Sequence, residues 1–397
     1  MTKVGLMTLS LDPTSTLPTD STSATLVGRV WRPELSGPSV VTIRHDGVFD
    51  ISRSFATMRD LCESADPAAS VAGAHADRIG DLAAILANTA EDKRDRHKPW
   101  LLAPIDLQAV KAAGVTFAIS LLERVIEEQA RGAPERAAAA RKEVEAALGG
   151  AIEKIKPGSP QAAELKRLLQ QKGLWSQYLE VGIGPDAEIF TKCQIMSAVG
   201  TGMSIGVLAQ STWNNPEPEV VVVATSKGRI IGATLGNDVN LRDIEGRSAR
   251  LLSKAKDNNA STAIGPFIRL FDRTFSLDDV RRTQVRLNVT GTDGFLLDGA
   301  SDVGKISRDP QELIDQMIGR HHQYPDGAVL FLGTMFAPVK DRDAPGMGFT
   351  HHAGDVVTIA ADKLGALVNV VTTSDKAPEW TFGVGDLMRN LAKRGLL

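Results

Sequence analysis

Two acidic residues stand at the start of an apolar run, in the segment Pro216-Glu-Pro-Glu-Val-Val-Val-Val-Ala-Thr. The run predicts a strand, and Glu217 and Glu219 are two residues apart, so both side chains leave one face of that strand. Unpaired carboxylates at such a place are costly to bury and shift their pKa upward. The pair therefore indicates a site that supplies a counter-charge.

A third acid, Asp238, joins this patch if the segment folds as a hairpin. Ile230-Ile-Gly-Ala-Thr-Leu predicts a second strand. With Lys227 and Gly228 as a two-residue loop, Glu217 falls opposite Asp238, and opposed residues point to the same side of a sheet. Three convergent carboxylates favour a hard cation, with Mg²⁺ expected and Mn²⁺ or Ca²⁺ as alternatives. The alternative interpretation is an exposed hairpin end with ordinary surface acids.

Two lysines, Lys254 and Lys256, follow shortly after the third acid. A lysine delivered near a carboxylate-bound cation is unexpected unless it meets an anionic substrate or moves a proton. The alternative is a solvated surface pair.

The elements that must position these residues divide into two predicted domains. Residues 1–98 predict a β-rich N-terminal domain, with strands near 25–31 and 40–44 and a helix near 78–90. The charged stretch EDKRDRHKPW resembles a boundary, so residues 99–397 form the predicted catalytic domain.

Helices and strands alternate in the second part in a way that predicts an α+β fold. We expect a short strand at 115–117, a helix at 118–131, and a helical insertion at 134–171 that is broken at Lys156-Pro-Gly-Ser-Pro. Strand patterns follow from 188 to 300 and resume at 327–337 and 354–371, with a helix at 307–320 between them.

Composition narrows the class of protein. The chain has 397 residues, 45 basic against 48 acidic residues and a net charge of -3, without a basic stripe, so nucleic acid is not an expected partner. Cys62 and Cys193 form no CxxC motif and allow no disulfide framework. No signal-peptide core or long apolar span occurs, so we expect a cytoplasmic protein without a membrane partner.

From about Gly114 to Val371, the order of motifs resembles the fumarylacetoacetate hydrolase superfamily. The matching motifs are Glu217-Pro-Glu219, Asp238, Lys256 ahead of Gly265-Pro266, Phe331-Leu-Gly-Thr334, the stretch Ile189-Phe-Thr-Lys-Cys-Gln-Ile-Met-Ser-Ala-Val-Gly, and Gly354-Asp-Val-Val-Thr-Ile with its closing strands. The resemblance implies a mixed β-roll catalytic domain, a Mg²⁺-bound small 2-oxo acid, and a homodimer or higher homo-oligomer.

One departure from the family pattern bears on the reaction. Hydrolases of the family carry Gly-x-Asn-Tyr-x-x-His-x-x-Glu, whose His and Glu prepare the attacking water. Here the stretch is Gly114-Val-Thr-Phe-Ala-Ile-Ser-Leu-Leu-Glu123, with Ser120 at the position of the His. A serine cannot deprotonate water at neutral pH. With the 134–171 insertion and the Asn237–Arg247 segment, the chain is similar to the 2-keto-3-deoxy-pentonate dehydratase branch.

The resemblance also implies roles for single residues. Metal ligation falls to Glu217, Glu219 and Asp238, and Lys256 would neutralise or protonate the 2-oxo oxygen. Gly333 and Thr334 would hold the substrate carboxylate, with Lys192 and Ser197 as further substrate contacts. Glu123, on one helical face with Ser120, would be the acid/base.

Three hypotheses of function follow. In the first, a dehydratase converts a xylonate- or arabinonate-derived 2-keto-3-deoxy-pentonate to 2-oxoglutarate semialdehyde, because chelation by the cation acidifies the C3 protons enough for a modest base to form an enolate. The second is a 2,4-dioxo acid (acylpyruvate) hydrolase with the same metal and another water base. The third is a non-catalytic, metal-stabilised β domain.

Overall fold

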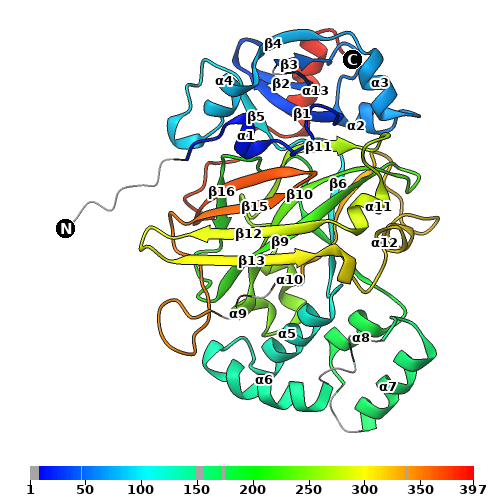
Figure 1. Cartoon of the computed structure of the whole chain (residues 1–397), viewed down its shortest axis with the longest axis vertical. Coiled ribbons are helices and arrows are strands. Elements are labelled where there is room, and N and C mark those ends of the chain that lie inside the picture. Colours follow the sequence, from blue (N-terminus) through cyan, green and yellow to red (C-terminus); the bar gives the residue numbers. More distant parts are fainter. Residues whose placement is uncertain are drawn as a thin grey trace.

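The computed structural model describes residues 9–45, 47–148, 152, 155–171, 175–336, 338 and 340–397. In this part of the chain, two sheets lie one over the other (Figure 1). The larger has eleven strands in the order β4-β3-β2-β1-β11-β10-β9-β14-β6-β7, with β5 paired to β1. The smaller has five strands in the order β13-β12-β15-β16-β8. The fold is α+β, as the sequence predicts.

The strands of the larger sheet are β1 (Leu26–Arg32), β2 (Gly37–Arg44), β3 (Gly47–Asp50), β4 (Asp77–Asp81), β5 (Trp100–Leu102), β6 (Ala109–Gly114), β7 (Glu188–Cys193), β9 (Asn214–Ala224), β10 (Ile230–Leu241), β11 (Thr262–Leu270) and β14 (Ala328–Phe331). Those of the smaller sheet are β8 (Ser204–Val207), β12 (Gln284–Thr290), β13 (Leu296–Asp302), β15 (Val356–Ala361) and β16 (Gly365–Thr373).

The main apolar core fills the space between the two sheets. Val220 and Val222 of β9 point into it and meet side chains such as Leu287 of β12 and Ile359 of β15. The alternate residues Val221 and Val223 point to the other side, into a second core with the N-terminal helices. Because side chains alternate along a strand, Glu217 and Glu219 share the face of Val221 and Val223.

Most of the helices gather at the two ends of the molecule, and the others lie beside or below the sheets (Figure 1). At the end formed by the insertion, α5, α6, α7 and α8 share an apolar cluster of their own. The helices are α1 (Pro13–Thr16), α2 (Met58–Cys62), α3 (Pro67–Gly73), α4 (Leu82–Ala87), α5 (Ala118–Gln129), α6 (Pro134–Leu148), α7 (Pro160–Gln171), α8 (Gln177–Ile183), α9 (Arg242–Glu245), α10 (Leu252–Ala255), α11 (Leu277–Arg281), α12 (Pro310–Met317) and α13 (Val384–Lys393). No helix in the described ranges is long and apolar enough to cross a membrane.

Two local predictions are wrong. Residues 77–81 form strand β4, so the helix predicted near 78–90 begins only at Leu82. The strand predicted at 115–117 lies earlier in the chain: β6 ends at Gly114, and Val115 has a left-handed φ of 55° that breaks the strand.

The N-terminal segment shares its sheet with the rest of the chain. Strand β1 pairs antiparallel with β11, with Leu26 opposite Arg269. Strand β5, which follows the predicted boundary at residue 98, pairs back onto β1. The division into two domains at residue 98 stays a prediction. Strand pairing joins the segments on the two sides of this residue.

The β9–β10 pair has the register that the sequence predicts, with Asp238 opposite Glu217 and Gly236 opposite Glu219. The predicted two-residue loop is wrong. The Thr225 N–H donates to the Arg229 carbonyl at 3.0 Å, which leaves three residues in the loop, and Gly228 supplies its left-handed conformation at φ 77°. A register shift between Ile230 and Gly232 then restores the predicted pairing.

Candidate active site

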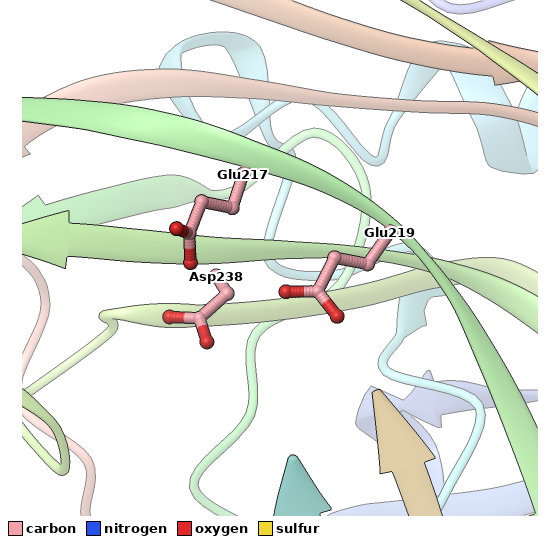
Figure 2. A group of neighbouring side chains, drawn as sticks. All are labelled: Glu217, Glu219 and Asp238. Atoms are coloured by element: carbon pink, nitrogen blue, oxygen red, sulfur yellow. The ribbon is translucent and has the colours of Figure 1, made fainter. Parts of the chain in front are cut away.

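Three carboxylates converge where β9 and β10 run side by side (Figure 2). One oxygen from each of Glu217, Glu219 and Asp238 lies within 4.8 Å of the others. Glu219 and Asp238 are buried, and Glu217 is half-buried. An all-oxygen set of this size suits a hard divalent cation and leaves coordination positions open for water or substrate.

Two ammonium groups hold one side of Asp238. The Lys256 Nζ lies 2.8 Å from the Asp238 Oδ1 and also donates to the Val239 carbonyl at 3.2 Å. Lys192 Nζ contacts the same Oδ1 and is fully buried. Both lysines engage one oxygen of Asp238, so the other oxygen is the one available to a cation.

Charge and burial act differently on the three acids. Burial raises the pKa of Glu217 to about 7, although Lys256 acts in the other direction. Burial and the charges of Asp238 and Glu217 raise the pKa of Glu219 well above its ordinary value. Burial alone would raise the pKa of Asp238 as well, but Lys192 and Lys256 outweigh it and lower that pKa. A divalent cation would supply the positive charge that the two glutamates need.

Arg124 of α5 connects the helical end of the molecule to the carboxylates. Its guanidinium lies 3.3 Å from the Glu217 Oε1 and 3.0 Å from carboxylate oxygens of both Glu127 and Glu245. Glu245 in turn lies 3.1 Å from the Lys256 Nζ. These contacts fix Glu217 and Lys256 from the side of α5 and α9.

A pocket opens beside the carboxylates, and its wall includes most of the predicted site residues. It is lined by Ser120, Lys256, Gly333, Thr334 and the three acids, together with Tyr178, Glu188 and Arg124. The Ser120 hydroxyl donates to the Phe117 carbonyl at 2.9 Å. The Tyr178 hydroxyl donates to the Glu245 carbonyl at 2.9 Å.

The segment that follows strand β14 contributes the backbone at Gly333. This residue has φ 84°, and a Cβ on it would come within 2.1 Å of the Thr116 Oγ1. Its N–H donates to the Glu219 Oε2 at 2.5 Å, so it holds a carboxylate of the site. The buried Thr334 hydroxyl accepts from the Phe336 N–H at 3.1 Å and can still donate to a ligand.

Three predicted site residues lie outside the wall of this pocket. Glu123 is buried against Arg242 of α9, with 3.1 Å between Nη2 and Oε2, and against Arg141 of α6 at 2.8 Å. Lys192 lies behind Asp238. Ser197 donates to the Gln194 carbonyl and lines a different cavity. Their assignments as substrate or acid/base groups stay predictions.

Glu188, at the start of β7, is a carboxylate of the pocket that the sequence analysis did not find. It is half-buried, and burial raises its pKa above the ordinary value. No hydrogen bond or ion pair within 4.0 Å reaches its side chain from the described residues. Its strand lies beside β6, where Glu188 is opposite Gly114. The sequence signal was an acid directly before the Ile-Phe-Thr-Lys strand.

Comparison with known families agrees with this site. Residues 197–372 match the family described as "Fumarylacetoacetate (FAA) hydrolase C-terminal". This segment of the chain is a domain of the fumarylacetoacetate hydrolase type. The matched segment contains Glu217, Glu219, Asp238, Lys256 and Thr334.

Two relatives are similar to this chain in sequence. A probable 2-keto-3-deoxyxylonate dehydratase of Haloferax volcanii is 27% identical over 341 residues, which cover 85% of this chain and 97% of the relative. A 2-dehydro-3-deoxy-D-arabinonate dehydratase of Saccharolobus solfataricus is 32% identical over 187 residues, which cover 46% of this chain and 58% of the relative. Both relatives are named as dehydratases, which are lyases.

Solved structures agree on the fold. A 2-keto-3-deoxy-D-arabinonate dehydratase in its apo form has a TM-score of 0.62 at 22% identity, covering 88% of this chain and 99% of that one. The same enzyme complexed with magnesium and 2,5-dioxopentanoate has a TM-score of 0.60 at 22% identity, with the same coverage. A fumarylacetoacetate hydrolase from Exiguobacterium antarcticum has a TM-score of 0.51 at 15% identity, covering 88% of this chain and 100% of that one.

Proposed function

We propose that the enzyme removes water from a 2-keto-3-deoxy-pentonate, derived from xylonate or arabinonate, to form 2-oxoglutarate semialdehyde, also called 2,5-dioxopentanoate. The observation that carries this proposal is that one pocket holds both the carboxylate triad and a separate carboxylate, Glu188, which has no ion-pair partner among the described residues. The same pocket has Ser120 where a hydrolase has its histidine. The names of the relatives and the 2,5-dioxopentanoate complex support it.

The residues fit a resident Mg²⁺, with Mn²⁺ or Ca²⁺ as alternatives. The donor set consists of oxygen atoms alone, and two of the three acids are held at raised pKa because burial leaves them without enough positive charge. When bound, such an ion would polarise the 2-oxo group and acidify the neighbouring C3 protons.

Three side chains of the pocket wall bind the substrate and move its protons. The Thr334 hydroxyl binds the substrate carboxylate, and the Lys256 ammonium stabilises negative charge on the 2-oxo oxygen. Glu188 takes a proton from C3 and returns one to the C4 hydroxyl as it leaves, since its raised pKa suits both directions of transfer. Shifts of protons from C5 and its hydroxyl to C3 and C4 then give the aldehyde, so the net change is loss of one water.

Product analysis in D₂O tests this proposal. Purified enzyme with Mg²⁺ is incubated with 2-keto-3-deoxy-xylonate, 2-keto-3-deoxy-arabinonate and an acylpyruvate, and products are identified by mass. We expect a five-carbon product that has lost one water and gained deuterium at C3. Release of pyruvate and a carboxylic acid from the acylpyruvate at a comparable or higher rate would establish the hydrolase alternative instead. The homodimer and the cytoplasmic location remain predictions of the sequence.

A further inference from the structure

A second cavity, of about 460 Å³, lies between the N-terminal strands and the segment before α13. Strands β1 and β5, the loop that follows β7, and residues 378–382 form its walls. Its volume falls in the range of small-molecule sites, about 300–1,000 Å³. None of the three carboxylates lines it, so its occupant would be separate from the substrate described above.

Aromatic rings are concentrated at this cavity. The sequence has five tryptophans, and Trp31, Trp100 and Trp380 line it together with Phe382. Trp31 stacks on Trp100 with 5.8 Å between ring centroids, and Phe382 meets Trp31 edge-on at 5.1 Å. Trp380 is 44% exposed, so one large ring of the set is open to solvent. Such rings offer flat apolar faces on which another ring can stack.

The charged groups at the wall are mainly cations. The Arg94 guanidinium lies 5.0 Å from the Trp100 ring centroid, and Arg96 is exposed nearby. Across the described residues, neither arginine has a carboxylate oxygen within 4.0 Å, and no hydrogen bond from the Arg96 side chain is found. Arg29 has Asp106 at 3.9 Å, and Glu379 is the acid among the lining residues. The charge of this cavity therefore complements an anion.

The loop wall is held in a fixed, uncommon conformation. Two non-glycine lining residues, Met196 and Ala260, have left-handed φ values of 68° and 58°. The loop after β7 is tied to the loop before β11 because the Gln194 N–H and side-chain amide donate to Asp257 at 3.1 and 2.8 Å. Backbone strain of this kind persists where the surrounding structure over-determines it, and it clusters at binding sites. Ser197, which resembled a substrate contact in sequence, belongs to this wall.

We propose that this cavity binds a small molecule made of a planar aromatic ring that carries an anionic group. The ring stacks on Trp380 and the neighbouring aromatic residues, and the anion pairs with Arg96, with Arg94 behind it. Nucleotides and aromatic carboxylates share this chemistry. A second copy of the chain is the competing occupant of the open face.

Isothermal titration calorimetry with four probes tests the proposal on the full-length protein. AMP has a ring and an anion, adenosine has the ring alone, ribose 5-phosphate has the anion alone, and salicylate is an aromatic carboxylate. We expect AMP or salicylate to bind at least about tenfold more tightly than either partial probe, since stacking and a charge-assisted contact each contribute on this scale. Which of the two binds distinguishes a nucleotide from an aromatic carboxylate.

Two variants locate the binding. Arg96→Glu and Trp380→Leu should each weaken the tighter probe by about tenfold or more, whereas Arg320→Glu, an exposed charge reversal at a different surface, should not. Equal effects of Arg96→Glu and Arg320→Glu, or no heat with any probe, would overturn the proposal. So would sedimentation that shows a dimer dispersed to monomers by Trp380→Glu, because the cavity would then be a contact between copies.

Discussion

The carboxylate of Glu188 lies against the Cα of Gly114: a Cβ placed on that glycine would come within 2.0 Å of the Glu188 Oε2. Gly114 is the last residue of β6, and its role here does not depend on unusual backbone angles. The absent side chain leaves the space in which the Glu188 carboxylate reaches the pocket wall. This relationship connects a glycine of the family-like stretch 114–123 to the residue that we propose as acid and base.

We therefore expect Gly114→Ala to lower kcat by about 10²-fold, because a displacement near 1 Å of a reacting group has an effect of that size. The thermal midpoint should change little, since the colliding atom is the end of a flexible side chain. Gly319→Ala is the matched control, because no atom lies within 4 Å of its added Cβ. In a Glu188→Gln background, Gly114→Ala should have a much smaller effect. Full additivity would contradict the relationship.

Removal of the Glu188 carboxylate should lower kcat at least as much as Gly114→Ala does. Glu188→Gln keeps the shape but cannot accept a proton, so we expect a decrease of about 10²–10⁴-fold. Mg²⁺ affinity, measured by calorimetry without substrate, should be nearly unchanged. Glu123→Gln is the comparison, because Glu123 is bound to Arg141 and Arg242 outside the pocket wall. If Glu123→Gln has the larger effect on kcat with metal affinity intact, the acid/base is Glu123, as the family-like sequence first indicated.

Metal removal should affect stability as well as activity. Without a cation, Glu217, Glu219 and Asp238 repel one another, so chelator treatment should lower the thermal midpoint and abolish turnover. Mg²⁺ or Mn²⁺ at about 100 times its dissociation constant should restore about 2.7 kcal/mol. Glu219→Gln should lose this metal-dependent rise in differential scanning fluorimetry, while Glu164→Gln, an exposed glutamate of α7, should keep it. A chelated protein with full activity would argue against the metal site.

The helical insertion should respond to ligand. Arg141 of α6 contacts Glu123, and the neighbouring Arg124 contacts the metal ligand Glu217, so α6 lies two contacts from the site. Amide exchange in α6 and α7 should slow when Mg²⁺ and pyruvate bind together, as expected for a lid that orders over substrate. Peptides from α12 serve as the internal control. Equal exchange with and without ligand would indicate a static element instead.

The acidic triad could be predicted from sequence because strand alternation and hairpin register are local rules. The register was right even though the loop was wrong: a three-residue loop and a register shift after Ile230 compensate for each other. The position of such a shift cannot be predicted from the sequence alone, because it depends on how both strands pack in the sheet.

The wall of the pocket was harder to predict, because it depends on contacts between distant elements. Glu123 kept its place in a family-like motif, but Arg242 lies far along the chain, and their ion pair is a feature of packing. Glu188 carried no motif, and only the pairing of β7 with β6 brings it to the pocket. The helical insertion was recognisable from composition alone, whereas the strand at 77–81 and the break at Val115 were not.

The pairing of β1 with β11 bears on how the protein could be divided. A fragment beginning at residue 99 would leave β11 with a row of unpaired N–H and carbonyl groups, and β5 without its only partner strand in the described chain. Exposed edges of this kind recruit other strands and lead to aggregation. We therefore expect the isolated fragment from residue 99 to be insoluble. In the full-length chain, both parts should unfold together on heating, in a single cooperative transition.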